Sequence, residues 1–325
     1  MKRSPVSIFA LSLLVAGCGG DSGPTFGGAP PVGTSFPIDG SNGVAVTQLS
    51  WEAAVASGGL TDLGGAAGLS GNAPDGSAIA ERARRSEGLL VDVISQVPFG
   101  PDTFPCDGGT GTVTISGDLT VPGTFTPGDT FLIVYELCDE GFGEVVDGTV
   151  GLTVRDFSGD IFLGTYLLSM DADIDTLSVA TASDTIVGSG DATITLDTTE
   201  TPYIEAGVSG GVLTQDSLAS LETLRNYASA QTFDGNLVPA IYTMDASGTL
   251  ESNQLPGNVV YSTATTFQGN EGEYPNTGVL LVSGDNSSAR LIAVDATNVR
   301  IEIDSNGDGT TDEIIELTWA ELEGG

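Results

Sequence analysis

Alternation of apolar and polar residues over the greater part of the chain is the feature that most restricts its fold. Thr112–Ser116 alternates cleanly, and Phe131–Tyr135 is an unbroken run of β-branched, aromatic and apolar residues. Successive side chains of a strand point to opposite faces, so a period of two predicts strands with one buried face. Asp-Gly, Pro-Gly and other glycine-rich breaks separate the runs. Such breaks suit hairpin turns, which need residues with positive φ.

The same signal predicts about a dozen or more strands. The further expected strands are 145–157, 161–171, 176–182, 185–196, 203–212, 238–245, 248–252, 259–267, 278–283, 289–294 and 299–303. Tight turns indicate an antiparallel meander, because parallel strands would need a crossover helix between each pair. A sheet of this length must curl, close or fold on itself. We expect a mainly β chain forming a curved open sheet or barrel with two or three packed helices, with a β-sandwich as the alternative.

Three segments have helical rather than strand spacing. Ser41 or Asn42 is placed to cap a short helix that stops at the glycines 58 and 59. A second apolar stripe runs over 77–97, and its polar face carries Arg82, Arg84 and Arg85. We expect these arginines to form salt bridges with nearby carboxylates; a binding role is the alternative. A third helix is expected to begin at Asp216 or Ser217, with an apolar stripe of Leu218, Leu221, Leu224 and Tyr227.

The first 18 residues have the layout of an export signal. A cationic start with Lys2 and Arg3 precedes an apolar run and small residues that end at Cys18. A Cys at this place resembles the lipobox of bacterial lipoproteins, which are cut before the Cys and acylated on it. The resemblance implies a mature chain that starts at Cys18 and is held to a membrane by several acyl chains. Gly19 favours, by the same resemblance, the outer membrane of a Gram-negative bacterium; a soluble secreted protein is the alternative.

Four regions follow from these patterns. Residues 1–17 are expected to be the lipoprotein signal peptide, and 18–36, rich in Gly, Pro and Ser, a flexible tether. Residues 37–100 are expected to form a helical segment. Residues 101–325 are expected to form an antiparallel β domain.

Charge and missing residue types narrow the function. Loss of the signal leaves seven Arg against 44 acidic residues, a net charge of −37. Such a chain repels nucleic acid and attracts divalent cations. There is no His, and the one Lys lies in the signal. Nucleophile systems built on His, His-ligated zinc and Lys Schiff bases are therefore excluded, and we predict no enzymatic activity and no catalytic residue.

The two remaining cysteines, Cys106 and Cys138, predict one disulfide, because an even pair in an exported protein is usually oxidised. Free or metal-binding thiols are the alternative.

One acidic segment near the C-terminus has the spacing of a calcium loop. Oxygen-bearing side chains occupy positions one, three, five and nine, with Gly309 at six; the expected ligands are Asp304, Asn306, Asp308, Asp312 and the Thr310 carbonyl. The nine residues resemble the calcium loops of EF-hands, dockerins and thrombospondin type 3 repeats. Ile315 replaces the usual bidentate Glu, and the flanks alternate like strands. We expect weak, structural Ca²⁺ binding at a hairpin tip; a turn that binds nothing is the alternative.

These patterns predict an outer-membrane lipoprotein with a non-catalytic binding or structural role. The alternatives are a carrier of an apolar ligand in a curved sheet and a carboxylate-based hydrolase such as a glycosidase. An envelope protein, a glycan or an apolar ligand would each suit as partner. Asp171, Asp173 and Asp175 share one strand face or turn, which we expect to be solvated; a second cation site is the alternative. Trp51 and Trp319 are expected to be packing residues, with a sugar-stacking platform as the alternative.

Overall fold

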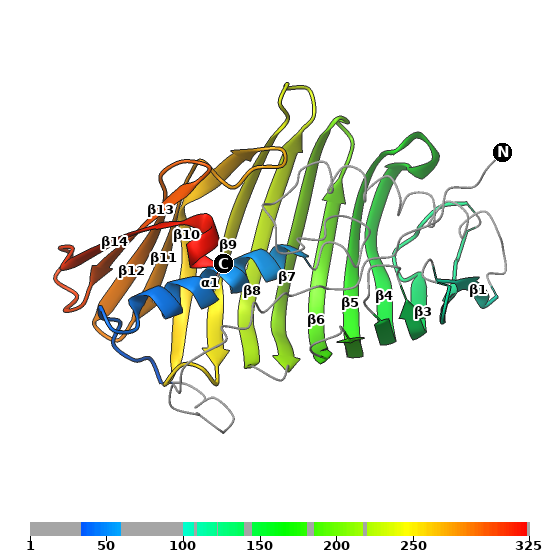
Figure 1. The fold of residues 1–325 in the computed structure, drawn as a ribbon. Helices are drawn as coiled ribbons and strands as arrows, with labels where there is room; N and C mark the ends of the chain where they lie inside the picture. Colours follow the sequence, from blue (N-terminus) through cyan, green and yellow to red (C-terminus); the bar gives the residue numbers. More distant parts are fainter. Residues whose placement is uncertain are drawn as a thin grey trace.

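The computed structural model describes residues 34–59, 100–106, 109–121, 123–139, 145–180, 185–216 and 220–323. Within these ranges the chain forms one sheet of 14 antiparallel strands, each hydrogen-bonded to its neighbours in chain order (Figure 1). The strands are β1 Asp102–Pro105, β2 Thr112–Asp118, β3 Thr130–Asp139, β4 Val145–Asp160, β5 Thr165–Ala180, β6 Thr185–Asp197, β7 Tyr203–Asp216, β8 Leu221–Asp234, β9 Ile241–Ser252, β10 Asn258–Asn270, β11 Thr277–Gly284, β12 Ser287–Ala293, β13 Asn298–Asp304 and β14 Glu313–Thr318.

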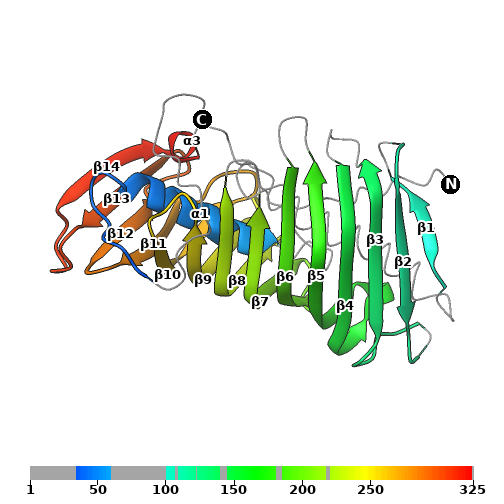
Figure 2. The same cartoon turned by 90° about the horizontal axis from the view of Figure 1, so that it is seen from below.

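The sheet is open, with β1 and β14 as its two edges. Seen from below, the half from β7 to β14 curves around helix α1, Gly43–Gly59, which lies along one face (Figure 2). The contacts of α1 with strands run from β7 to β13. The expectation of a mainly β chain with a long antiparallel meander and an open sheet is confirmed.

The two faces of the sheet differ in polarity. We call the face that packs against α1 the inner face, and the opposite one the outer face. In β2–β6 the inner face carries buried apolar side chains, and one row of register partners consists of Phe131, Leu152, Ala172 and Ala192. The outer face carries mainly polar residues, as the period of two in the sequence predicts.

Helix α1 fills the inner face of the curved half. Trp51 lies 5.0 Å from Phe267 and 4.8 Å from Trp319, between ring centroids. Trp319 opens the short helix α3, Trp319–Leu322, where Thr318 and Glu321 form a capping box. The expected first helix is confirmed, and the Asn42 carbonyl accepts its first bond from the Val46 amide. The residues 77–97, with Arg82, Arg84 and Arg85, lie outside the described residues.

The prediction of a helix after Asp216 is wrong, because Leu221–Asp234 is strand β8. Leu224 and Tyr227 are both buried although they are three residues apart. The pairing of β8 with β9 is irregular between Arg225 and Ala228, and Asn226 has a φ of 47°. One extra residue in this β-bulge shifts the inward set by one position. The bulge therefore mimics the three-residue spacing of a helix.

Bulges also explain why some observed strands are longer than the strands predicted from the sequence. The expected strands 161–171 and 176–182 are one strand, β5, in which the register slips at Asp175. Residues Ile161–Leu163 form a 3-10 turn, η2, before it. Strand β9 likewise joins the expected strands 238–245 and 248–252, and β1 was not anticipated.

A disulfide joins Cys106, directly after β1, to Cys138 in β3, with 5.5 Å between their Cα atoms. The expected pairing is therefore confirmed. At the N-terminal end of the described chain, the carbonyls of Thr34 and Phe36 accept hydrogen bonds from the amides of Asn258 and Asp285. Phe36 is buried.

Candidate functional site

A groove of about 940 Å³ crosses the outer face over strands β2–β6. Its polar side chains come from consecutive strands, so a regular sheet rather than a loop positions them. They are Ser116, Asp118, Thr130, Thr153, Arg155, Asp171, Asp173, Asp191 and Thr193. We call this feature the outer groove.

The strand register places these residues in two rows. One row runs from Thr130 through Thr153 and Asp171 to Thr193, and each member is the direct partner of the next. The second row is Leu132, Gly151, Asp173 and Asp191. A Cβ atom added to Gly151 would meet its nearest atom only at 3.8 Å, so this glycine leaves room in the middle of the groove.

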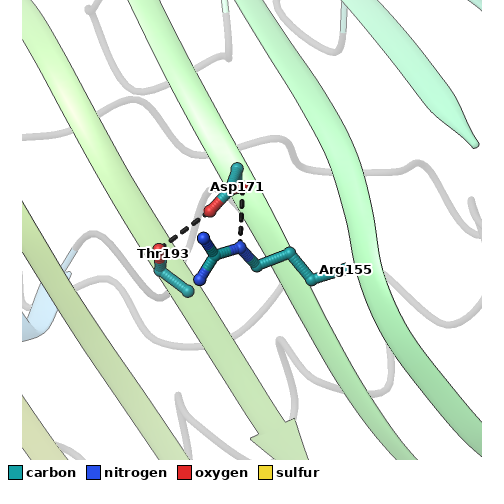
Figure 3. Close-up of polar contacts among 3 residues, drawn as sticks. All are labelled: Arg155, Asp171 and Thr193. Atoms are coloured by element: carbon teal, nitrogen blue, oxygen red, sulfur yellow. Dashed lines mark hydrogen bonds and ion pairs between the residues drawn. The ribbon is translucent and has the colours of Figure 1, made fainter. Parts of the chain in front are cut away.

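Arg155 is the one basic side chain that lines the groove in the described chain. The register of β4 with β5 slips between Val154 and Asp156, so Arg155 is the extra residue of a bulge, a feature that often re-aims a side chain. Its Nε donates to Asp171 Oδ2 at 2.8 Å, and Thr193 Oγ1 donates to the other oxygen at 2.8 Å (Figure 3). The Arg155 and Asp171 side chains are 57% and 44% exposed, so solvent and a ligand have access to this pair.

Asp191 is held by backbone amides at the far side of the groove. Its two carboxylate oxygens accept hydrogen bonds from Gly211 N at 2.9 Å and Val212 N at 3.2 Å. The buried Tyr227 donates its hydroxyl to the Asp191 carbonyl at 2.6 Å. A Cβ at Gly210 would lie 2.2 Å from that carbonyl, so glycine is needed there. The Asp191 backbone and carboxylate are therefore both fixed before any ligand binds.

The groove is acidic, with four aspartates against one arginine. Carboxylates and threonine hydroxyls can accept hydrogen bonds from amines and hydroxyl groups, and Arg155 can donate to an acceptor. Of the three acidic residues singled out in the sequence, Asp171 and Asp173 line the groove and Asp175 does not. Sequence reasoning missed Asp118, Arg155 and Asp191, because only the register of five strands brings them together.

The expected calcium ligands lie in one exposed hairpin loop between β13 and β14, and both flanks are strands. Asp304 accepts from the amides of Gly307 at 2.7 Å and Gly309 at 2.8 Å. Asp312 accepts from Ser305 N at 2.9 Å, and the Thr310 amide donates to Asp308 at 2.8 Å. Hydrogen bonds from Thr310 lower the pKa of Asp308. Across the described ranges, no three His, Cys, Asp or Glu are grouped as a metal centre.

Three other carboxyls lie away from the groove, near α1. Burial raises the pKa of Glu222 in β8 to about 7, and the Glu52 carboxylate of α1 adds to this. Burial also raises the pKa of Glu52 and of Glu323, with hydrogen bonds from Gln48 and Tyr274 opposing it. None of the three lines the outer groove.

Comparisons with protein-family models, curated proteins and solved structures find no match for this chain. No helix in the part of the chain that the structure describes is long and apolar enough to cross a membrane. Cys18, the expected lipidation site, lies outside the described residues.

Proposed function

We propose that this protein is a cell-envelope lipoprotein, anchored through acyl chains on Cys18 to the outer membrane of a Gram-negative bacterium. Its role is non-catalytic binding, and the outer groove is the binding surface. The export signal and the Cys that ends it support the location. The groove supports the binding role.

The observation that carries the proposal is the alignment of polar side chains from five strands around one hollow. A solvated strand face needs polar residues, but it needs neither the gap at Gly151 nor the fixed carboxylate of Asp191. Binding sites of proteins combine a concave surface with a few polar groups held in place. The outer groove has both features.

The charge of the groove indicates the class of ligand. Four aspartates and one arginine favour a ligand that carries amines, with hydroxyl groups as further hydrogen-bonding partners. Polyanions such as nucleic acid are repelled by a chain with 44 acidic residues. An amine-bearing glycan or a basic peptide segment of an envelope protein fits this chemistry.

The two alternative functions have less support. A carboxylate-based hydrolase needs a carboxyl with a raised pKa in its cleft, and Glu52, Glu222 and Glu323 lie near α1, away from the groove. A carrier of apolar ligands needs space on the inner face. Trp51, Trp319 and Phe267 pack together there.

Calorimetric titration with spermine, a linear tetra-amine, tests the groove. The double variant Asp171→Asn/Asp173→Asn should bind at least tenfold more weakly than the unchanged chain, since hydrogen bonds to charged groups contribute about 1.5–3 kcal/mol each. The matched control is Glu205→Gln/Asp245→Asn, which removes the same charge from exposed or half-exposed positions of β7 and β9. The control should change affinity less than twofold. Equal losses in both variants would mean that net charge alone attracts the amine, and no binding by the unchanged chain would contradict the proposed ligand class.

The hairpin loop between β13 and β14 is proposed as a weak structural calcium site. Asp304, Asn306, Asp308 and Asp312 would supply side-chain oxygens and Thr310 a carbonyl, all hard donors of the kind that Ca²⁺ prefers. When bound, the ion would offset the charge of three aspartates and stabilise the last hairpin by mass action.

A further inference from the structure

Helix α1 carries one charged residue, and it lies where a charge is costly. Glu52 is partly buried, and its Oε1 accepts a hydrogen bond from Gln48 in the same helix at 3.0 Å. Every other residue of α1 is uncharged. A carboxylate at a packed interface needs a cation, donors or a proton.

The strand β8, which packs against α1, brings another carboxyl within electrostatic range of Glu52. Glu222, on the inner face of β8, is 9% exposed and close enough for the two charges to repel. Its direct neighbour across the strand pair is Gln215 of β7, which is 8% exposed. The Gln215 side-chain nitrogen has no hydrogen-bond partner among the described residues. Ser220 donates a hydrogen bond that favours the charged form of Glu222, and burial outweighs it.

No arginine of the described strands compensates this pair. The four arginines of the described ranges pair with carboxylates elsewhere: Arg155 with Asp171, Arg225 with Glu251, and Arg290 and Arg300 with Glu302. Other side chains around α1 whose pKa is raised are Tyr227, Tyr242, Tyr261, Tyr274 and Glu323. Glu323 is acidic and adds to the repulsion on Glu52. Burial raises the pKa of each tyrosine, so these residues stay neutral and supply no positive charge.

We propose that the docking of α1 on the sheet depends on a proton held by the pair Glu52 and Glu222, and that losing this proton loosens the helix. The cost of two like charges in a buried contact disappears when one of them is neutral. A protonated Glu222 also becomes a hydrogen-bond donor, which a carboxylate is not. The device is independent of the outer groove, because it lies on the opposite face.

The direction of the effect follows from proton binding. The docked state holds the proton of Glu222 up to a pH of about 7, whereas a solvent-exposed Glu releases it near its ordinary value of 4.5. The docked state therefore binds more protons between these two values, and its stability falls as the pH rises through this window. Above a pH of about 7, the stabilisation that the proton gives to the docked state is lost completely.

Hydrogen exchange of the α1 amides tests this proposal on the full chain, with rates corrected for the intrinsic pH dependence. Between pH 5.5 and pH 8.0 the opening of α1 should increase about 25-fold, the ratio expected for a group that moves from 4.5 to about 7 on docking. Glu222→Gln should remove most of that increase. Glu251→Gln is the matched control, because Glu251 of β9 is also buried but paired with Arg225, and it should leave the increase in place.

Two outcomes would overturn the proposal. One is protection of α1 that stays constant between pH 5.5 and 8.0, and the other is an unchanged increase in Glu222→Gln. If Glu222→Gln does not fold, a carbon-13 NMR titration of the Glu222 carboxyl decides, and a midpoint near 4.5 would contradict the proposal.

Discussion

Removal of the Cys106–Cys138 disulfide should destabilise one end of the sheet and leave the other unchanged. The bridge spans 32 residues and ties β1 and β2 to β3. The loss of loop-closure entropy in the unfolded chain for this separation corresponds to about 3.7 kcal/mol at 25 °C. The double variant Cys106→Ala/Cys138→Ala should therefore lose about this much stability in the strands β1–β3.

The effect should be local, because α1 contacts strands from β7 to β13 and so ties together the half that lies away from the bridge. Trp51 and Trp319 pack against each other in that half and report its unfolding by fluorescence. In urea, amide exchange in β1–β3 should speed up in the variant, whereas the tryptophan midpoint should move by less than about 0.3 M. A sheet in which strands contact mainly their neighbours can unfold in parts.

Two results would refute this reasoning. A tryptophan midpoint that falls by about 1 M, the shift expected if the whole 3.7 kcal/mol were shared, would show that the 14 strands unfold as one unit. Unchanged exchange in β1–β3 would show that the loop-closure calculation overstates the role of the bridge. The unchanged chain in reductant is the control, since it breaks the same bond without removing either sulfur.

Three further predictions concern the hairpin loop, the inner face and the core. Calcium at ten times its dissociation constant should stabilise the fold by about 1.4 kcal/mol in a thermal melt, and Asp308→Ala should abolish the rise. Chemical unfolding should show stability falling from pH 4.5 to about 7, and Glu222→Gln at pH 8 should recover up to about 3 kcal/mol; a stability that rises over this range would contradict the sign. Trp319→Ala should cost about 3–5 kcal/mol in urea, and a cost below 1 would mean that the ring is not a core residue.

The sheet could be predicted from the sequence wherever its strands are regular. Alternation marks β2, β6, β11 and β13 within a few residues of their ends, because one face of each is buried. Strand β8 could not be predicted, because the bulge between Arg225 and Ala228 turns its inward spacing from two into three. A bulge has no signature in a pattern of apolar residues.

The outer groove could not be predicted for a different reason. Asp171 and Asp173 are visible as alternating acids, but Arg155 and Asp191 become their neighbours only through the register of β4, β5 and β6. Register depends on turn lengths and bulges along more than 40 residues. The pairing of Glu52 with Glu222 could not be predicted either, because 170 positions separate the two residues in the chain.

The proposal that acyl chains on Cys18 hold this sheet at a membrane is tested most directly by mass spectrometry of the N-terminal peptide of the native protein. The expected peptide starts at Cys18 and carries a diacylglycerol thioether and an acylated amino group. A peptide that continues through Cys18 from an earlier residue, or one that starts at an unmodified Cys18, would contradict the proposal.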